Sequence, residues 1–288
     1  MLAPEIAIFA QIMEWCRGGN VALLQAYFDE SERPGGLLCV AGFAFAPQQA
    51  LKLAKEYRAH FGEYGGFHMK DVVNRAKRYK GISDSLRDSL VKRAVEIVKR
   101  RFSYGVAVTV NVDEFKAEAP RWLRGFKNPY PFLCHMAMVG LAKVSTDHGD
   151  ASPITYFFEA GHPHESEPHD FVAIATMTDE LRSFYRYSGS AFLPKAQAVP
   201  LQAADLLAWE MGKFKDETID KSVREMRQSL LCLCRDAPKR FQVAFCGGES
   251  LSRALGKYRA LGIQQVMENQ ECERQKQLRR NSPSSTMQ

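Results

Sequence analysis

The sequence lacks the short motifs that assign several common enzyme classes. It has no Walker A motif and no Rossmann glycine motif, so it gives no indication of a nucleotide cofactor. The glycines near Ser31 do not form a nucleophile elbow, and no Ser-His-Asp signature is evident. Its seven cysteines include no CxxC pair, and "CLC" at 232–234 matches no common zinc spacing. We therefore expect reduced thiols and a cytoplasmic protein.

Long hydrophobic runs are also scarce. The apolar opening stretch, "MLAPEIAIFAQIMEW", has no basic n-region and carries Glu5 and Glu14, which makes it a poor signal peptide. It is too short and too interrupted to span a membrane, so we expect residues 1–20 to be an N-terminal extension and the protein to make no membrane contact. Residues 265–288 lose apolar periodicity and end in Ser and Pro, as a flexible tail does.

The composition between these ends is that of a globular protein. The chain has 288 residues, 45% hydrophobic and 25% charged, which allows a sizeable core. The formal charge of +6 is mildly basic and compatible with an anionic partner. We expect residues 21–264 to form a single domain whose C-terminal part is helical.

Apolar runs and helical patterns alternate along this domain. Two runs joined by "ERPGG" predict a β-hairpin, and later strands alternate with helices, so the pattern predicts an α/β fold with a mixed sheet. The expected strands lie at 21–28, 37–46, 103–115 and 153–161, and the expected helices include 47–61, 84–101 and 201–214; residues 217–264 read as mostly helical.

Carboxylates occur where buried elements end. Asp29 and Glu30 follow the run "VALLQAYF", and Glu159 closes "PITYFFEAG". In "LQAADLLA", Asp205 shares an apolar helix face with Leu201. A single such pair is most simply the start of a polar turn, but three acids in strongly hydrophobic elements suggest a shared site.

A shared site of this kind needs a cation, because clustered carboxylates repel one another. Oxygen ligands suit Mg²⁺ or Mn²⁺ better than zinc. Such a cluster is suited to phosphoryl transfer, in which two metals about 3.5–4 Å apart activate water and stabilise the leaving oxygen.

Four motifs in order, "FDES", "FHMKD", "FFEAG" and "LQAADLLA", resemble the uncharacterised family known as domain of unknown function thirty-eight hundred. The resemblance covers about residues 22–215. It implies a ribonuclease-H-like mixed sheet flanked by helices and a metal site formed by Asp29, Glu159 and Asp205. Glu32 departs from the family pattern, in which a small residue is expected after "DES".

Other polar residues near these motifs are further candidates. His68 in "FHMKD" is a candidate for contact with the metal or the scissile phosphate, although a loop histidine beside a capping aspartate explains it equally well. Candidates for a supporting role are Glu30, Asp71, Gln202 and His162. A basic stretch that is either a solvated face or a set of phosphate contacts comprises Lys70, Arg75, Lys77, Arg78 and Lys80.

The sequence thus leads to three hypotheses. The first is a metal-dependent nuclease or related phosphodiesterase, a hydrolase that uses Mg²⁺ or Mn²⁺ and acts on DNA or RNA. The second is a non-catalytic nucleic-acid-binding module on the same fold. The third is a structural or regulatory scaffold protein whose acids are buried and protonated. Oligomeric state is left open.

Overall fold

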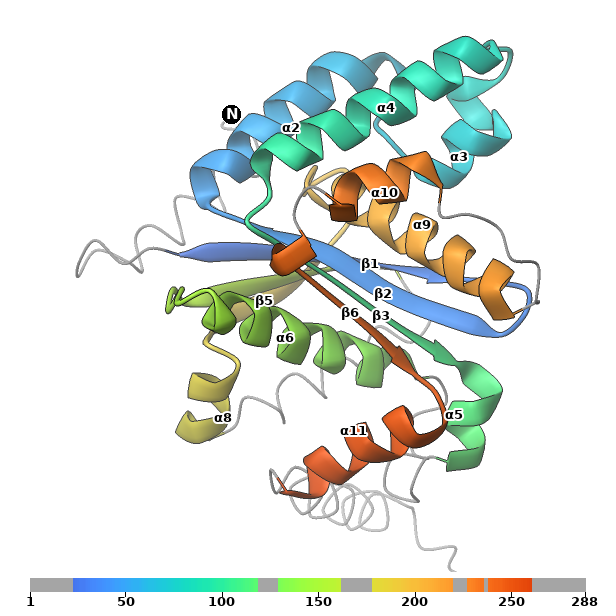
Figure 1. The fold of residues 1–288 in the computed structure, drawn as a ribbon. Helices are drawn as coiled ribbons and strands as arrows, with labels where there is room; N and C mark the ends of the chain where they lie inside the picture. Colours follow the sequence, from blue (N-terminus) through green and yellow to red (C-terminus); the bar gives the residue numbers. More distant parts are fainter. Residues whose placement is uncertain (1–22, 119–128, 162–177, 220–226, 236–237, 261–288) are drawn as a thin grey trace, which may run out of the picture.

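The structure is a computed structural model, and it describes residues 23–118, 129–161, 178–219, 227–235 and 238–260. Within these residues the strands form one six-stranded sheet in the order β5-β4-β1-β2-β3-β6 (Figure 1). β1, β2 and β3 are successively antiparallel; β4 runs parallel to β1, β5 to β4, and β6 to β3. The strands are β1 (Leu24–Glu32), β2 (Leu37–Phe45), β3 (Tyr104–Asn111), β4 (Ile154–Glu159), β5 (Tyr187–Leu193) and β6 (Phe241–Cys246).

Helices cover both faces of the sheet (Figure 1). On one face lie α2 (Pro47–Phe61), α3 (Met69–Asn74), α4 (Asp84–Arg101), α9 (Leu201–Ile219) and α10 (Gln228–Arg235). On the other lie α6 (Tyr130–Asp147), α8 (Asp179–Phe184) and α11 (Gly248–Ala260), while α5 (Val112–Glu118) follows the end of β3. This topology confirms the predicted α/β class, a mixed sheet flanked by helices.

Local sequence explains the β1–β2 hairpin and the start of helix α4. In the middle of β2, a Cβ on Gly42 would lie 1.9 Å from the carbonyl oxygen of Tyr27, so only glycine allows β1 and β2 to approach. Ser83 caps α4, because its hydroxyl accepts a hydrogen bond from the Leu86 amide at 3.1 Å. Both elements were predicted from their sequence patterns.

Two stretches differ from the sequence prediction. The strand expected at 103–115 ends at Asn111, whose side-chain oxygen accepts hydrogen bonds from the amides of Asp113 and Glu114 and so begins α5. Within 217–264, which was predicted to be mostly helical, "FQVAFC" forms β6 beside β3. The expected extension at 1–20 and tail at 265–288 lie outside the described residues, and the domain boundaries remain a prediction.

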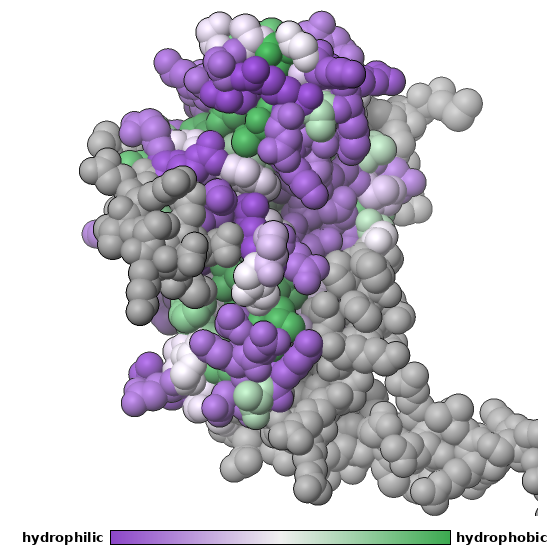
Figure 2. Space-filling model, turned by 90° about the vertical axis from the view of Figure 1, so that its right-hand side faces the viewer, coloured by the Kyte–Doolittle hydropathy of each residue, from purple (hydrophilic) through white to green (hydrophobic). Residues whose placement is uncertain are grey.

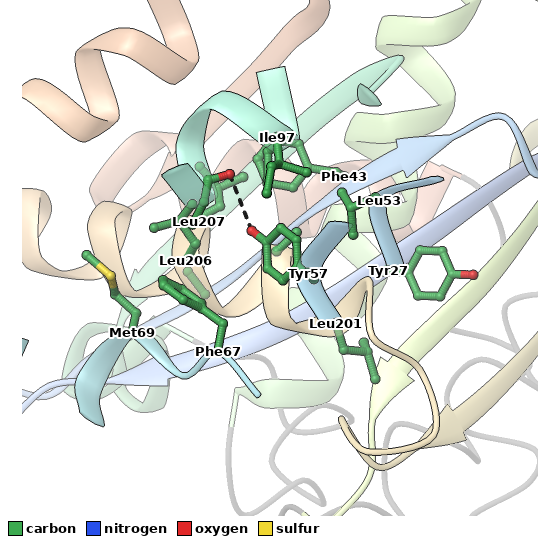
Figure 3. Close-up of a cluster of buried hydrophobic side chains, with 14 of the residues drawn as sticks. Tyr27, Phe43, Leu53, Tyr57, Phe67, Met69, Ile97, Leu201, Leu206 and Leu207 are labelled. Carbon is green, nitrogen blue, oxygen red and sulfur yellow. Dashed lines mark hydrogen bonds between the residues drawn. The ribbon is translucent and has the colours of Figure 1, made fainter. Parts of the chain in front are cut away.

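Two hydrophobic cores fill the space between the sheet and its helices. One lies under α6, α8 and α11, and the other lies under α2, α4 and α9. Figure 3 shows the second, in which Phe43 of β2, Leu53 and Tyr57 of α2 and Ile97 of α4 pack against α9. The Tyr57 hydroxyl donates a hydrogen bond to the Ala94 carbonyl at 3.5 Å, drawn as a dashed line. Because both sheet faces are covered, the central strand β2 is buried at every position.

Two further observations concern membrane spans and cysteines. In the part of the chain that the structure describes, no helix has the length and apolarity to cross a membrane. The described cysteines, at positions 39, 134, 232, 234 and 246, are free thiols.

A buried histidine in the first core predicts sensitivity to acid. His135 Nε2 lies 2.5 Å from the Tyr185 hydroxyl, and burial lowers the pKa of His135 to about 3. Between pH about 6.5 and 3 the unfolded chain binds a proton there and the folded chain does not, so the free energy of unfolding falls as pH falls, by at most about 1.4 kcal/mol per unit. Urea titrations at several pH values across this range are expected to show a smaller fall in the free energy of unfolding per pH unit for His135→Gln than for wild type. An equal fall in both proteins would contradict the prediction.

Candidate metal centre

Two predicted site residues lie at the same edge of the sheet, because β1 and β4 are parallel neighbours. Phe28 pairs with Phe158, so Asp29 and Glu159 follow as the next residues on their strands. Tyr27 and Phe157 belong to the core beneath α9, and strand alternation places Asp29 and Glu159 on that same face. Asp205 comes from α9 itself, so the α9 face of the sheet brings all three acids together.

The three carboxylates meet around Lys195, which follows the end of β5. Its ammonium Nζ lies 2.8 Å from Asp29 Oδ2, 2.9 Å from Glu159 Oε2 and 3.0 Å from Asp205 Oδ1. The Asp29 side chain is fully buried and that of Asp205 is 8% exposed, whereas those of Lys195 and Glu159 are about one-fifth exposed. The sequence analysis did not identify Lys195.

Glu30 also belongs to this group. Strand alternation points it away from Asp29, yet ligand atoms of Asp29, Glu30 and Glu159 all lie within 4.8 Å of one another. The Glu30 amide donates a hydrogen bond to Asp29 Oδ1 at 2.8 Å, which helps to fix that carboxylate on β1. We call Asp29, Glu30, Glu159 and Asp205 the carboxylate cluster.

Burial and mutual repulsion shift the titration of the carboxylate cluster. Burial raises the pKa of Asp29 well above its usual range; the Lys195 ammonium opposes this rise, and Glu159 and Asp205 add to it. Burial, followed by repulsion from Glu159, raises the pKa of Glu30 to about 7. Burial alone would lower the pKa of Lys195, but the carboxylates of Asp205, Asp29 and Glu159 outweigh it and raise the pKa. Lys195 is therefore a cation at any physiological pH.

Asp205 is held by the segment that precedes α3. The Met69 amide donates a hydrogen bond to Asp205 Oδ2 at 2.6 Å. One turn earlier on α9, Gln202 Oε1 accepts a hydrogen bond from the Phe67 amide at 2.8 Å. A Cβ on Gly66 would lie 2.9 Å from the Gln202 amide nitrogen, so this loop lies directly against α9. Gln202 thus supports the position of "FHMKD" beside Asp205.

His68 bridges two acids at the rim of the carboxylate cluster. Its Nε2 lies 3.4 Å from Asp205 Oδ1 and its Nδ1 lies 3.2 Å from Asp71 Oδ2, while about one-third of its side chain is exposed. Asp71 is also 2.8 Å from the ammonium of Lys77. The structure therefore brings His68 and Asp71 to the site, and their roles in chemistry remain predictions. His162 lies outside the described residues.

The basic stretch is divided between internal ion pairs and solvent. Arg75 pairs with Asp84, and Lys77 pairs with Asp71. Lys70, Arg78 and Lys80 are exposed. A contact between any of these five residues and nucleic acid remains a prediction.

The residues present fit a divalent cation. Asp29 Oδ2 and Glu30 Oε2 are buried without a hydrogen-bond partner, although Lys195 Nζ is an ion-pair neighbour of the first. Every potential metal ligand in the carboxylate cluster is a carboxylate oxygen, and hard cations such as Mg²⁺ and Mn²⁺ prefer such ligands. Full ionisation of four carboxyl groups beside one ammonium would leave an excess of negative charge, which the raised pKa values of Asp29 and Glu30 oppose and a divalent ion would offset.

The comparisons with known proteins found distant structural neighbours alone. No family model and no curated protein matches the sequence. The Q54A mutant of Bst ribonuclease HIII matches with 15% identity and a TM-score of 0.39, over 72% of this chain and 57% of that one. Bst ribonuclease HIII in complex with Mn²⁺ matches with 16% identity and a TM-score of 0.39, over 86% and 65%. Ribonuclease HII of Archaeoglobus fulgidus, in its complex with PCNA, matches with 13% identity and a TM-score of 0.36, over 83% and 90%.

The chain thus spans less than two-thirds of the length of either ribonuclease HIII chain. The fold class rests on the strand order and directions of this chain, and the resemblance to the uncharacterised family rests on the four sequence motifs.

Proposed function

We propose that the protein is a metal-dependent phosphodiesterase, and more narrowly a nuclease. One observation carries this proposal: carboxylates from β1, β4 and α9, which are far apart in sequence, lie within 3.0 Å of a single cationic atom, Lys195 Nζ. An arrangement that collects buried acids around one cation at the ends of parallel strands is suited to holding Mg²⁺ or Mn²⁺.

The proposed metal ligands are Asp29, Glu159 and Asp205, with Glu30 added because its carboxylate joins them. A bound divalent ion supplies Lewis acidity, which activates water and stabilises the leaving oxygen of a phosphodiester. Asp29 is the central ligand, since a fully buried side chain on a strand that is paired with β2 on either side of it is rigidly held.

His68 is the proposed proton-transfer residue. Its imidazole lies at the rim of the carboxylate cluster and is one-third exposed, so it is open both to a substrate and to solvent water. Asp71 lies 3.2 Å from Nδ1 and orients the ring, and Gln202 positions the loop that carries both residues. Lys195 compensates part of the negative charge and keeps the carboxylates together.

Lys195 is also the observation that favours a second function. A cluster neutralised by its own lysine has less need of a metal ion, so a non-catalytic nucleic-acid-binding module or a scaffold remains an alternative. A cytoplasmic location with reduced thiols is part of either proposal, and the described cysteines are free thiols.

A cleavage screen tests the proposed function. Labelled single- and double-stranded DNA and RNA and a DNA–RNA hybrid are incubated with the protein in Mn²⁺, in Mg²⁺ or in EDTA. Cleavage of at least one substrate is expected with metal and none is expected with EDTA. If the protein binds these strands in EDTA and cleaves none of them with either metal, the binding-module alternative replaces the nuclease.

A further inference from the structure

A large cleft lies beside the carboxylate cluster, between the β1–β2 turn, α3 and α9. Its volume is about 1000 Å³, at the upper end of the range for a site that encloses a small molecule. Figure 2 views this side of the molecule, where hydrophilic side chains predominate among the described residues. The cleft is lined by Ser31, Glu32, Arg33, Pro34, Gly36, Lys70, Val73, Asn74, Trp209, Lys213 and Arg227.

The charge of the cleft is positive. Four of its lining residues, Arg33, Lys70, Lys213 and Arg227, are basic, whereas Glu32 is its one acidic lining residue among those described. Lys70 is exposed and has no ion-pair partner among the described residues. A concave surface lined mainly by one sign of charge concentrates its field, so this cleft attracts an anionic ligand.

Trp209 holds two of these cations in fixed positions. The guanidinium carbon of Arg33 lies 4.9 Å from the centre of the Trp209 ring, and that of Arg227 lies 4.7 Å from it. Arg33 also donates a hydrogen bond to the Trp209 carbonyl at 2.5 Å. A Cβ on Gly212 would lie 3.2 Å from Arg33 Nε, so the Arg33 side chain lies close against α9. A guanidinium group that stacks on a ring donates its hydrogen bonds from its edge, and it is this edge that would contact phosphate oxygens.

Each of the three segments that line the cleft, at the β1–β2 turn, α3 and α9, also lies beside the carboxylate cluster. Trp209 lies four residues, about one helical turn, after Asp205 on α9. Ser31 is two residues after Asp29 on β1, on the same face of the strand. Lys70 follows Met69, whose amide is hydrogen bonded to Asp205. A chain-like ligand lying in the cleft would therefore extend directly to the carboxylates.

We propose that this cleft binds the phosphodiester backbone of a nucleic-acid strand through Arg33, Lys70 and Arg227 and directs the strand toward the carboxylate cluster. Binding in the cleft stands independently of catalysis, whereas delivery to the carboxylates rests on the proposed nuclease function. The ligand is an anionic polymer rather than an isolated anion because a cleft of about 1000 Å³ lined by four basic residues is larger than one small anion would fill.

Binding is measured in EDTA, by fluorescence anisotropy of labelled oligonucleotides over a range of salt concentrations. The test variant is Lys70→Gln with Arg227→Gln. Its matched control is Lys52→Gln with Lys55→Gln, two exposed lysines of α2 that lose the same charge outside the cleft. The cleft variant is expected to bind at least tenfold more weakly, with a salt slope smaller by roughly 1 for each lost phosphate contact. The control is expected to change little.

Arg227 lies 3.7 Å from the buried Glu210 carboxylate, so its loss could affect folding. Lys70→Glu alone, compared with Lys52→Glu, gives the same comparison without touching that contact, and circular dichroism verifies the fold. Equal losses in the cleft and control variants would overturn the proposal. So would displacement of the oligonucleotide by polyglutamate at equal charge, which would identify an acidic protein segment as the ligand.

The outcomes separate the two proposals. If binding depends on the cleft residues but no metal-dependent cleavage occurs, the nuclease proposal is rejected and the cleft proposal stands. If wild type cleaves and the cleft variants cleave with unchanged KM, the nuclease proposal stands and the cleft proposal is rejected.

Discussion

Asp29→Asn is expected to abolish metal-dependent cleavage while leaving the fold intact. The asparagine keeps the size of the side chain and an oxygen that can accept the Glu30 amide hydrogen bond, but it removes the charge of the central proposed ligand. The loss should exceed the roughly 10- to 100-fold effect of removing a group that only supports a metal ligand. Burial and the neighbouring acids raise the pKa of Asp29, and Lys195 keeps Glu159 and Asp205 as ion-pair partners when this charge is removed, so the fold should persist.

Cleavage rates of wild type and Asp29→Asn in Mn²⁺, together with anisotropy in EDTA, test this prediction. Asp147→Asn is the control, since that exposed acid pairs with Lys143 on α6, on the opposite face of the sheet. Nucleic-acid binding by Asp29→Asn should persist or strengthen as repulsion falls. Equal cleavage by wild type and Asp29→Asn would rule out the proposed mechanism.

Lys195→Met is expected to destabilise the metal-free protein and to make its stability depend on Mn²⁺. The substitution leaves the carboxylates of Asp29, Glu159 and Asp205 without their shared cation. Breaking a buried ion pair costs about 3–5 kcal/mol, and the partial exposure of Lys195 places the cost near the lower end. At about 2–4 °C per kcal/mol, the melting temperature should fall by roughly 6–12 °C in EDTA.

Added Mn²⁺ should raise the melting temperature of Lys195→Met more than that of wild type, since the carboxylates then have no competing ammonium. A ligand that binds only the folded state stabilises it by mass action. Adding Asp205→Asn to Lys195→Met should reduce this rescue. If Mn²⁺ shifts neither wild type nor Lys195→Met, the cluster is an internal ion-pair network and the scaffold or binding-module reading gains support.

The parts of the fold and site that the sequence predicted depend on local patterns. Hydrophobic runs that end in Asp29 and Glu159 mark buried strands, and helical periodicity places Asp205 on the face that covers them. These signals require no knowledge of distant contacts. They also predicted the hairpin and α4 with its Ser83 cap.

The parts that the sequence did not predict depend on contacts between distant segments. Lys195 is a lone lysine in a loop, and its importance follows from β5 running parallel beside β4, which brings the residues after both strands to one edge. Glu30 was predicted only as a supporting residue, whereas its ligand atom lies within 4.8 Å of those of Asp29 and Glu159. The contacts of Trp209 with Arg33 and Arg227 likewise join three separate stretches of chain.

The order of these residues along the chain has a consequence for protein synthesis. Asp29 and Glu159 emerge from the ribosome before Lys195 and Asp205, and β6 adds to the sheet later still. Until Lys195 and Asp205 arrive, the acids of β1 and β4 lack two of the groups that surround them in the folded chain, so the carboxylate cluster is incomplete on a partial chain. The proposed nuclease activity would therefore be absent from a nascent copy and would begin only when the domain is nearly complete.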